Sequence, residues 1–411
     1  MRSPLPKPMI HSEYDQVEMQ PHHSVAILPW GNVIEDFLDS LNLSLDQFCT
    51  DMTGGWLFGY IAALNLVNVS SVLICISNSI TTPTRRIHAP TGATIWLLPV
   101  LPRYQWIRRR MVNPYGWTLT ETFGAQSPLL WPWFFLQREL AAYSVTPLNA
   151  IQRVIEQENC QAILCQEYEY PRFDACVWLA RRLNLPIYAS FQGGDFQLTA
   201  VEKLWRKQTI RASTGLIVAT SSEIERVQRR YQLPDRQIAQ IFNPLDLSMW
   251  AGGDRAQTRA DLNLAPGDRV VVWHGRVERH RKGIDLLLNV WQQIQQTDPD
   301  QPFYLLLVGT GSDAPEIHRE IEHRNITNLH WVDEYILDRT RICNYLTAAD
   351  IYVLPSRHEG FPVAPLEAMA CSLPVVATAV PGIPNILQQG EKSGGIQVPC
   401  EDIAQLATTL R

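Results

Sequence analysis

The second half of the chain alternates short apolar runs with segments in which apolar residues recur at helical spacing. The apolar runs, which predict buried strands, are 269–274, 303–308, 329–332, 351–354 and 374–377. The segments with helical spacing are 284–293, 315–324, 341–348 and 362–371. Continuous apolar strands separated by helices are typical of a parallel sheet that is covered on both faces. Residues 268–411 are therefore predicted to form a doubly wound α/β domain.

The first half alternates in the same way but less regularly. Strands are predicted at 25–28, 72–76, 162–165, 186–190 and 215–219, and a helix at 56–66 follows Gly54 and Gly55. These elements predict another doubly wound domain over 23–245, with a polar linker over 246–267. Residues 1–22 lack the apolar core of a signal peptide and are predicted to be a mobile tail.

Composition and charge narrow the class of protein. The 411 residues carry a net charge of −6, whereas a nucleic-acid-binding protein usually has a basic surplus. The eight cysteines include no C-x-x-C pair, so buried free thiols in a reducing compartment are expected rather than a zinc or redox site. No apolar run reaches the ~18 uncharged residues of a membrane span. The protein is predicted to be cytoplasmic.

Polar and glycine-containing sequences follow three of the predicted strands in the second half. They are His274-Gly275-Arg276, Gly309-Thr310-Gly311 and His358-Glu359-Gly360. In open parallel sheets, ligands bind outside the carboxyl ends of the strands. These three sequences are therefore expected to converge on one site.

The segment PSRHEGFPVAPLEAMACSLPVVAT, at 355–378, carries the most specific signal. Glu359 lies in a loop after the strand at 351–354, and Glu367 lies inside the following helix, for which Pro362 is a suitable first residue. A helix N-terminus presents free N–H groups that attract phosphate. Carboxylates on either side accept hydrogen bonds from hydroxyls. A nucleotide sugar has phosphates flanked by hydroxyls, so it is the kind of ligand that this arrangement suits.

These residues resemble the E-x7-E signature of retaining glycosyltransferases of the GT-B fold, glycosyltransferase family 4 (glycosyl transferases group 1). The resemblance implies two Rossmann-like domains facing across a cleft, with the nucleotide sugar bound mainly by the second domain and the acceptor by the first. It implies that Glu359 contacts the donor sugar and Glu367 the ribose, with the backbone of Gly360 and Phe361 facing the sugar and phosphates.

Further donor-site residues follow from the same resemblance. Arg276 and Lys282, in the sequence GRVERHRKG, match a basic pair that holds the diphosphate and stabilises its departure. Three glycines of the predicted site allow the nucleotide to approach the backbone closely. They are Gly275, Gly309 and Gly311. Gly54 and Gly55 match a Gly-Gly that approaches the donor phosphates or the acceptor. A solvated basic loop and simple turns are the alternative interpretations.

The chain departs from the family pattern in two places. Many relatives carry a histidine where this chain has Gln192, which can hydrogen-bond a sugar hydroxyl but cannot transfer a proton. Gln192 and Asp195 are the acceptor-side candidates, and a loop-capping role is the alternative for Asp195. Relatives usually send a final helix back to the first domain, whereas this sequence stops within a predicted helix at Arg411.

Two other segments require interpretation. Asp298-Pro299-Asp300 resembles a metal-binding D-x-D, but it lies at the opposite end of the sheet from the site, so a solvated turn and no metal are predicted. Residues 101–136 interleave arginines with tryptophans and phenylalanines. Such a segment suits a lipid headgroup or membrane surface, an acceptor pocket, or a packed core with surface arginines.

The sequence thus predicts a metal-independent, retaining hexosyltransferase without a cofactor, which uses a UDP- or GDP-linked sugar. The acceptor is expected to be a glycan, a lipid-linked glycan or a small molecule, and peripheral contact with the inner face of the membrane through 101–136 is one interpretation. The alternatives are a nucleotide-sugar epimerase or hydrolase of the same fold, and a non-catalytic sugar-nucleotide-binding subunit.

Overall fold

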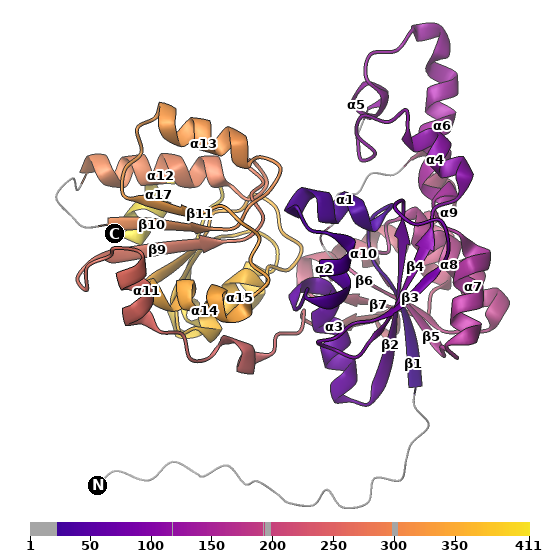
Figure 1. Cartoon of the computed structure of the whole chain (residues 1–411), viewed down its shortest axis with the longest axis horizontal. Helices are drawn as coiled ribbons and strands as arrows, with labels where there is room; N and C mark the ends of the chain where they lie inside the picture. Colours follow the sequence, from indigo (N-terminus) through magenta and orange to yellow (C-terminus); the bar gives the residue numbers. More distant parts are fainter. Residues whose placement is uncertain (1–22, 117, 192, 194–198, 298–302) are drawn as a thin grey trace, which may run out of the picture.

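The computed structural model describes residues 23–116, 118–191, 193, 199–297 and 303–411. The described residues form two α/β domains that lie next to each other along the long axis of the molecule (Figure 1). The predictions for the N-terminal tail at 1–22, for Gln192 and Asp195, and for the D-x-D turn lie outside the described residues.

The N-terminal domain is built on an eight-stranded sheet of order β3-β4-β2-β1-β5-β6-β7-β8. All neighbouring strands are parallel except β3, which pairs antiparallel with β4. The strands are β1 His23–Leu28, β2 Val69–Ser77, β3 Thr84–Ile87, β4 Thr94–Pro99, β5 Ala162–Gln166, β6 Ile187–Ser190, β7 Gly215–Val218 and β8 Ile238–Gln240. The sequence pattern did not predict β3, β4 or β8.

Helices cover both faces of this sheet. The helices of the domain are α1 Ile34–Leu38, α2 Leu45–Thr50, α3 Gly55–Leu66, α4 Pro102–Arg108, α5 Leu119–Phe123, α6 Trp131–Ser144, α7 Leu148–Gln157, α8 Pro171–Leu183, α9 Ala200–Ala212 and α10 Ser221–Tyr231. One apolar core packs α7 and α8 against the sheet, and another packs α2 and α3 against the opposite face. Burial on both faces explains why the central strands are continuous apolar runs rather than alternating ones.

The C-terminal domain has a parallel six-stranded sheet of order β11-β10-β9-β12-β13-β14. Its strands are β9 Arg269–His274, β10 Phe303–Val308, β11 Leu329–Val332, β12 Ile351–Leu354, β13 Val375–Thr378 and β14 Gly395–Val398. Its helices are α12 Ile284–Thr297, α13 Ala314–His323, α14 Arg339–Ala348, α15 Ala364–Ala370, α16 Ile383–Ile386 and α17 Ile403–Leu410. Strand order reverses between β9 and β12, which is where an open α/β sheet forms its ligand crevice.

Two local expectations differ from the structure. Pro362 is not the first helical residue, because α15 begins at Ala364 and Pro365 occupies its first turn. The segment 246–267, expected to be a linker, contains α11 Arg255–Asp261, which packs on α14. Arg259 of α11 is buried and donates to the carbonyl of Ala348 at 2.8 Å, so this segment is anchored to the C-terminal domain.

The described residues of 101–144, which comprise α4, α5 and α6, project from the N-terminal domain, and we call them the arm (Figure 1). The base of α6 contacts α8 and α9, while α5 and the first turns of α6 extend beyond the rest of the domain. The arm places many apolar side chains in contact with solvent rather than in a core.

None of the helices in the described ranges is both long and apolar enough to cross a bilayer. The eight cysteines are free thiols, and Cys49, Cys75, Cys160, Cys165, Cys176 and Cys343 are buried, as expected. The expectation of burial was wrong for Cys400, which is exposed, and holds in part for Cys371. Burial raises the pKa of the Cys49 thiol to about 11, which makes it a poor nucleophile at neutral pH.

Candidate functional site

A cavity of about 420 Å³ lies between the two domains. On the C-terminal side it is lined by residues that follow β9, β10 and β12, including Gly275, Gly309 and Glu359. The N-terminal side is mainly apolar and comes from the loop after β1 and from α1, α2 and α3; it includes Trp30, Ile34, Phe37, Phe48 and Leu57. The strand-end sequences therefore converge on one site, and its charged groups lie mostly on the C-terminal domain.

Glu359 forms an ion pair with Lys282 inside this cavity. The Nζ atom of Lys282 lies 2.8 Å and 2.9 Å from the two carboxylate oxygens, and the Ser356 hydroxyl donates to Oε1 at 2.7 Å. The Glu359 side chain is 9% exposed and that of Lys282 is 22% exposed. The fold thus brings a carboxylate and an ammonium together from two different loops.

Glu367 is held by two cationic or potentially cationic partners. Its Oε2 lies 2.8 Å from Nε2 of His274, and its Oε1 accepts from Nη1 of Arg339 at 3.4 Å. Burial by itself would raise the pKa of Glu367, but the hydrogen bond and charge of His274, together with the charge of Arg339, lower it below its ordinary value. The side chain is therefore a charged acceptor at neutral pH.

Two buried ring nitrogens of cavity-lining residues have no hydrogen-bond partner among the described residues. They are Nε1 of Trp273 and Nδ1 of His274, both buried at the end of β9, and both residues line the cavity. A buried polar atom without a partner carries a free-energy cost unless a ligand or water satisfies it. The two unpartnered nitrogens thus belong to residues at the cavity wall.

Arg276 also lines the cavity and forms an ion pair with Glu278 of the same loop. Arg281, from the same basic loop, reaches across to the N-terminal domain, where Nη2 donates to the carbonyl of Gly193 at 3.0 Å. This loop thus supplies three cations to the cavity, Arg276, Arg281 and Lys282. Such a cluster suits an anionic group such as a diphosphate.

Glycines allow the backbone to turn closely around the cavity. Gly309 has a φ of +129°, and a Cβ there would lie 2.0 Å from the carbonyl oxygen of Gly275. Gly54 has a φ of +65°, and a Cβ there would meet the guanidinium of Arg339 at 2.2 Å. Gly311 packs against the backbone of Val277 instead, so its role is in the turn after β10 rather than at the cavity wall.

The two domains touch at the rim of the cavity. A Cβ on Gly193, whose φ is +83°, would lie 2.7 Å from the Gly360 backbone. The rings of Phe242 and Phe361 stack with centroids 4.9 Å apart, and Nδ2 of Asn243 donates to the Phe361 carbonyl at 3.3 Å. The loop that contains the first glutamate is thus positioned by both domains.

The structure shows where the predicted site residues lie. Those that line the cavity are Glu359, Arg276, Lys282, Glu367, Gly360, Phe361, Gly309, Gly275, Gly54 and Gly55. Reasoning from sequence missed Arg339, whose Nη2 donates to the Thr53 carbonyl of the other domain at 2.6 Å. It also missed Trp30, Trp273 and Asn243. No local pattern marks these residues, because their positions follow from how the two domains meet.

Comparisons with known proteins agree with this geometry. Residues 268–411 match the model of the family described as Glycosyl transferases group 1. This part of the chain is similar to a glycosyl transferases group 1 domain. It contains both glutamates, the basic loop and the glycines of the C-terminal side.

Curated relatives match a little over half of the chain. D-inositol 3-phosphate glycosyltransferase of Rhodococcus jostii (strain RHA1) is 28% identical over 250 residues, which cover 57% of this chain and 55% of the relative. Alpha-maltose-1-phosphate synthase of Mycobacterium tuberculosis is 27% identical over 221 residues, 51% of this chain and 54% of the relative. The chain spans about half the length of the curated relatives it matches.

Solved structures resemble nearly the whole chain. Sucrose-phosphate synthase from Thermosynechococcus elongatus has a TM-score of 0.63 at 19% identity, covering 94% of this chain and 88% of its own. HepE from Anabaena, in complex with UDP, has a TM-score of 0.62 at 13% identity, with coverage of 94% and 88%. The chain therefore has the GT-B fold, with its cavity between the two domains.

Among the described residues, no three His, Cys, Asp or Glu side chains gather in a group that could hold a metal ion. The positive charge in the cavity comes from side chains of the basic loop and from Arg339.

Proposed function

We propose that this protein is a retaining glycosyltransferase that moves a hexose from a UDP- or GDP-linked donor to an acceptor hydroxyl, without a metal or other cofactor. The observation that carries the proposal is the convergence of Glu359, Glu367 and the basic loop on one interdomain cavity. A nucleotide sugar needs cations for its diphosphate and acceptors for its hydroxyls, and the cavity offers both. UDP in the HepE structure agrees with such a donor.

In this proposal each side chain has a separate task. Glu367 accepts hydrogen bonds from the ribose hydroxyls, while Arg276 and Lys282 bind the diphosphate. Glu359 orients the sugar, and because it already holds Lys282, it also fixes the ammonium beside the leaving group. Fixed cations that need no reorganisation stabilise the charge that develops as the bond to the diphosphate breaks.

The proposed reaction breaks the bond between the anomeric carbon and the diphosphate oxygen, and forms a bond from that carbon to the acceptor oxygen on the same face. The proton of the acceptor hydroxyl passes to the departing diphosphate, so no protein base is required. The diphosphate keeps the electron pair of the broken bond. The acceptor enters from the N-terminal side, where Trp30, Ile34 and Phe37 form an apolar wall.

The acceptor class is proposed as a glycan, a lipid-linked glycan or an apolar small molecule, which the apolar wall favours over a highly charged acceptor. A cytoplasmic location belongs to the same proposal, and it is supported by the six buried free thiols, which suit a reducing compartment.

The proposal is tested by measuring release of UDP or GDP from their hexose conjugates in the presence and absence of candidate acceptors. Acceptor-dependent release, with a product that keeps the anomeric configuration of the donor by NMR, is expected. Glu359→Ala and Arg276→Ala should each reduce transfer strongly, whereas Arg153→Ala, an exposed arginine on α7, should not. Transfer that survives in the Glu359→Ala, Arg276→Ala double variant would refute the site assignment. Release that needs only water would favour a hydrolase or epimerase.

A further inference from the structure

The arm exposes an unusually large apolar surface. Ten large apolar side chains of the described arm residues are exposed: Leu101, Trp106, Val112, Leu129, Leu130, Trp131, Trp133, Phe135, Leu136 and Leu140. At the tip, Leu129 is 90% exposed, and Trp131 and Trp133 are 50% and 51% exposed. Contiguous apolar patches of this kind on a protein surface mark an interaction site.

The first turns of α6 are apolar on every side. The sequence from Pro128 to Leu136 is PLLWPWFFL, nine residues without a polar side chain. A helix that is apolar all round is normally buried in a core or in a membrane, yet this one projects beyond the domain (Figure 1). Such a helix favours an apolar partner surface.

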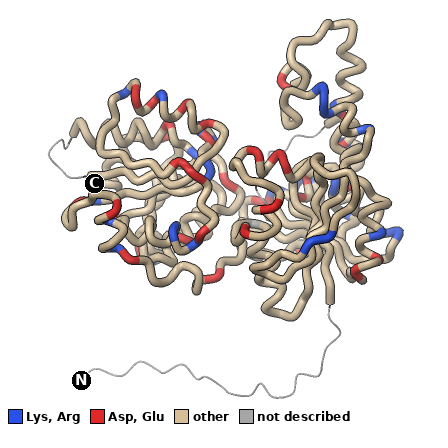
Figure 2. Tube along the Cα trace, viewed as in Figure 1, with Lys and Arg blue, Asp and Glu red and all other residues tan. Residues whose placement is uncertain are grey.

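The arm is also basic in an acidic protein. Residues 101–144 contain five arginines and two glutamates, a net charge of +3, whereas the whole chain carries −6. Arg103, Arg109 and Arg110 are exposed. Figure 2 shows acidic positions gathered on the α1 and α2 side, toward the C-terminal domain, and few in the arm. This charge favours an anionic partner for the arm.

Cationic and apolar side chains form one continuous surface. Arg103, Trp106 and Arg110 recur at helical spacing on α4 and the turn that follows it, and the guanidinium of Arg110 lies 3.7 Å from the Trp106 ring centroid. The Trp106 ring in turn packs edge-on against Trp133 of α6, with centroids 6.1 Å apart. Tryptophan rings beside arginines are typical of side chains at the level of lipid headgroups.

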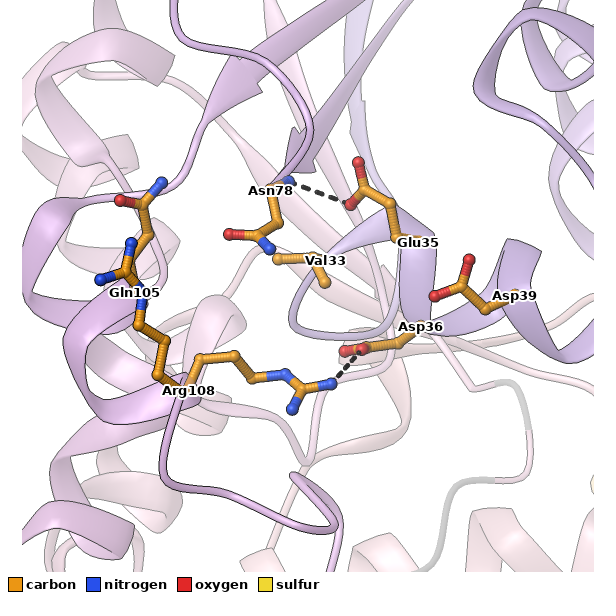
Figure 3. A pocket seen from close by; sticks show the side chains of 8 residues that line it. Val33, Glu35, Asp36, Asp39, Asn78, Gln105 and Arg108 are labelled. Atoms are coloured by element: carbon orange, nitrogen blue, oxygen red, sulfur yellow. Dashed lines mark hydrogen bonds and ion pairs between the residues drawn. The ribbon is translucent and has the colours of Figure 1, made fainter.

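The arm is tied to the domain, and through it to the cavity. Arg108 and Tyr115 both donate to the Asp36 carboxylate of α1, at 3.3 Å and 3.0 Å. Figure 3 shows the Arg108–Asp36 pair at a second cavity of about 420 Å³, on the side of α1 that faces α4. The Tyr115 ring stacks on Trp30, which lines the interdomain cavity, with centroids 5.3 Å apart.

From these observations we infer that the arm docks on the surface of an anionic lipid bilayer. The tip at 129–136 inserts among the acyl chains and headgroups, and the exposed arginines contact lipid phosphates. Because Tyr115 and Trp30 connect the arm to the cavity, docking holds the apolar wall of the cavity near the membrane. This last step, presentation of a lipid-borne acceptor, rests on the proposed transferase function, whereas docking itself does not.

Flotation of the full chain with vesicles tests the inference. Binding to vesicles of phosphatidylcholine mixed with phosphatidylglycerol is expected, with much weaker binding to phosphatidylcholine alone, and high salt should weaken it. Each arginine near an anionic surface contributes about 1 kcal/mol, so Arg103→Ser with Arg110→Ser should lower the partition coefficient about 30-fold. Arg153→Ser on α7 is the matched control and should bind as the wild type does.

Leu129→Glu with Trp131→Glu should abolish vesicle binding without loss of folding, because both side chains are exposed. Leu66→Glu, at a residue of α3 that is 87% exposed, is the matched control. Equal binding by the tip variant and the wild type, or no preference for anionic vesicles, would overturn the inference. If the wild type sediments as a dimer, the tip variant sediments as a monomer and neither binds vesicles, the arm contacts a second copy of the chain. That result would also overturn the inference. Thermal stabilisation by UDP or GDP, measured on the same variants, reports the donor site separately.

Discussion

Replacing Glu367 by glutamine removes the charge from the buried carboxylate that is proposed to bind the ribose. The amide keeps the size of the side chain but offers one acceptor oxygen where the carboxylate offers two. In the structure these oxygens meet His274 at 2.8 Å and Arg339 at 3.4 Å, and the side chain is 10% exposed. The substitution therefore affects both the stability of the site and its ability to accept from a ligand.

The magnitude follows from the contacts. A hydrogen bond to a charged group contributes about 1.5–3 kcal/mol, and about 1.4 kcal/mol corresponds to a tenfold change in affinity. Loss of one such bond to the ribose should therefore weaken binding of UDP or GDP about 10- to 150-fold. The same loss toward His274 or Arg339 should lower the free energy of unfolding by about 1–3 kcal/mol.

Titration calorimetry with matched ligands separates these effects. UDP and GDP are compared with their 2′,3′-dideoxy forms, which lack both ribose hydroxyls, on the wild type and on Glu367→Gln. The substitution should weaken binding of the ribose forms strongly and that of the dideoxy forms little, because the dideoxy forms make no hydrogen bond for the variant to lose. Glu322→Gln on α13 is a control outside the cavity. An equal loss for both kinds of ligand would refute the ribose assignment, since the variant would then act through the fold of the site.

Three further predictions concern the same cavity. The folded-state pKa of Glu367 lies below its ordinary value of 4.5, so its contribution to stability is present above pH 4.5 and is lost as the pH falls through the lowered pKa. The free energies of unfolding of the wild type and Glu367→Gln, measured in urea, should therefore converge at acid pH. A difference that stays constant with pH would contradict the shift. Lys282→Met and Glu359→Gln should each lower the free energy of unfolding by about 1–3 kcal/mol. The double variant should lose less than the sum of the two single losses, because the ion pair is lost only once. Additive losses would show that the pair is not coupled. Gly193→Ala should weaken donor binding, because its Cβ meets the Gly360 backbone at 2.7 Å, whereas the control Gly252→Ala, also in the left-handed region but with nothing within 4 Å, should not.

The sequence predicted the C-terminal domain well for a physical reason. Strands buried on both faces must be continuous apolar runs, so β9, β10 and β12 were visible without knowledge of their neighbours. Ligand-facing residues follow such strands directly, which made Gly275, Gly309 and Glu359 recognisable. Here a local pattern was sufficient because the backbone itself positions the site.

Other features could not be predicted because they depend on contacts between distant segments. Arg339 begins α14 with no marked motif, and it matters because it bridges Glu367 and the Thr53 carbonyl of the other domain. The segment 246–267 looked like a polar linker, since helix α11 buries Arg259 through hydrogen bonds to carbonyls rather than through an apolar stripe. The arm at 101–144 was identified as unusual, but its projection from the domain is a tertiary property.

Thermal unfolding of the full chain with UDP, GDP and ADP tests most directly whether the interdomain cavity binds a nucleoside diphosphate. A ligand at ~100 times its dissociation constant should add about 2.7 kcal/mol to the free energy of unfolding. Stabilisation by UDP or GDP is expected; it should be lost when Arg276→Ala and Glu367→Ala are combined and kept in Arg153→Ala. A folded chain that none of the three nucleotides stabilises, or a stabilisation that survives in the combined variant, would contradict binding at this cavity.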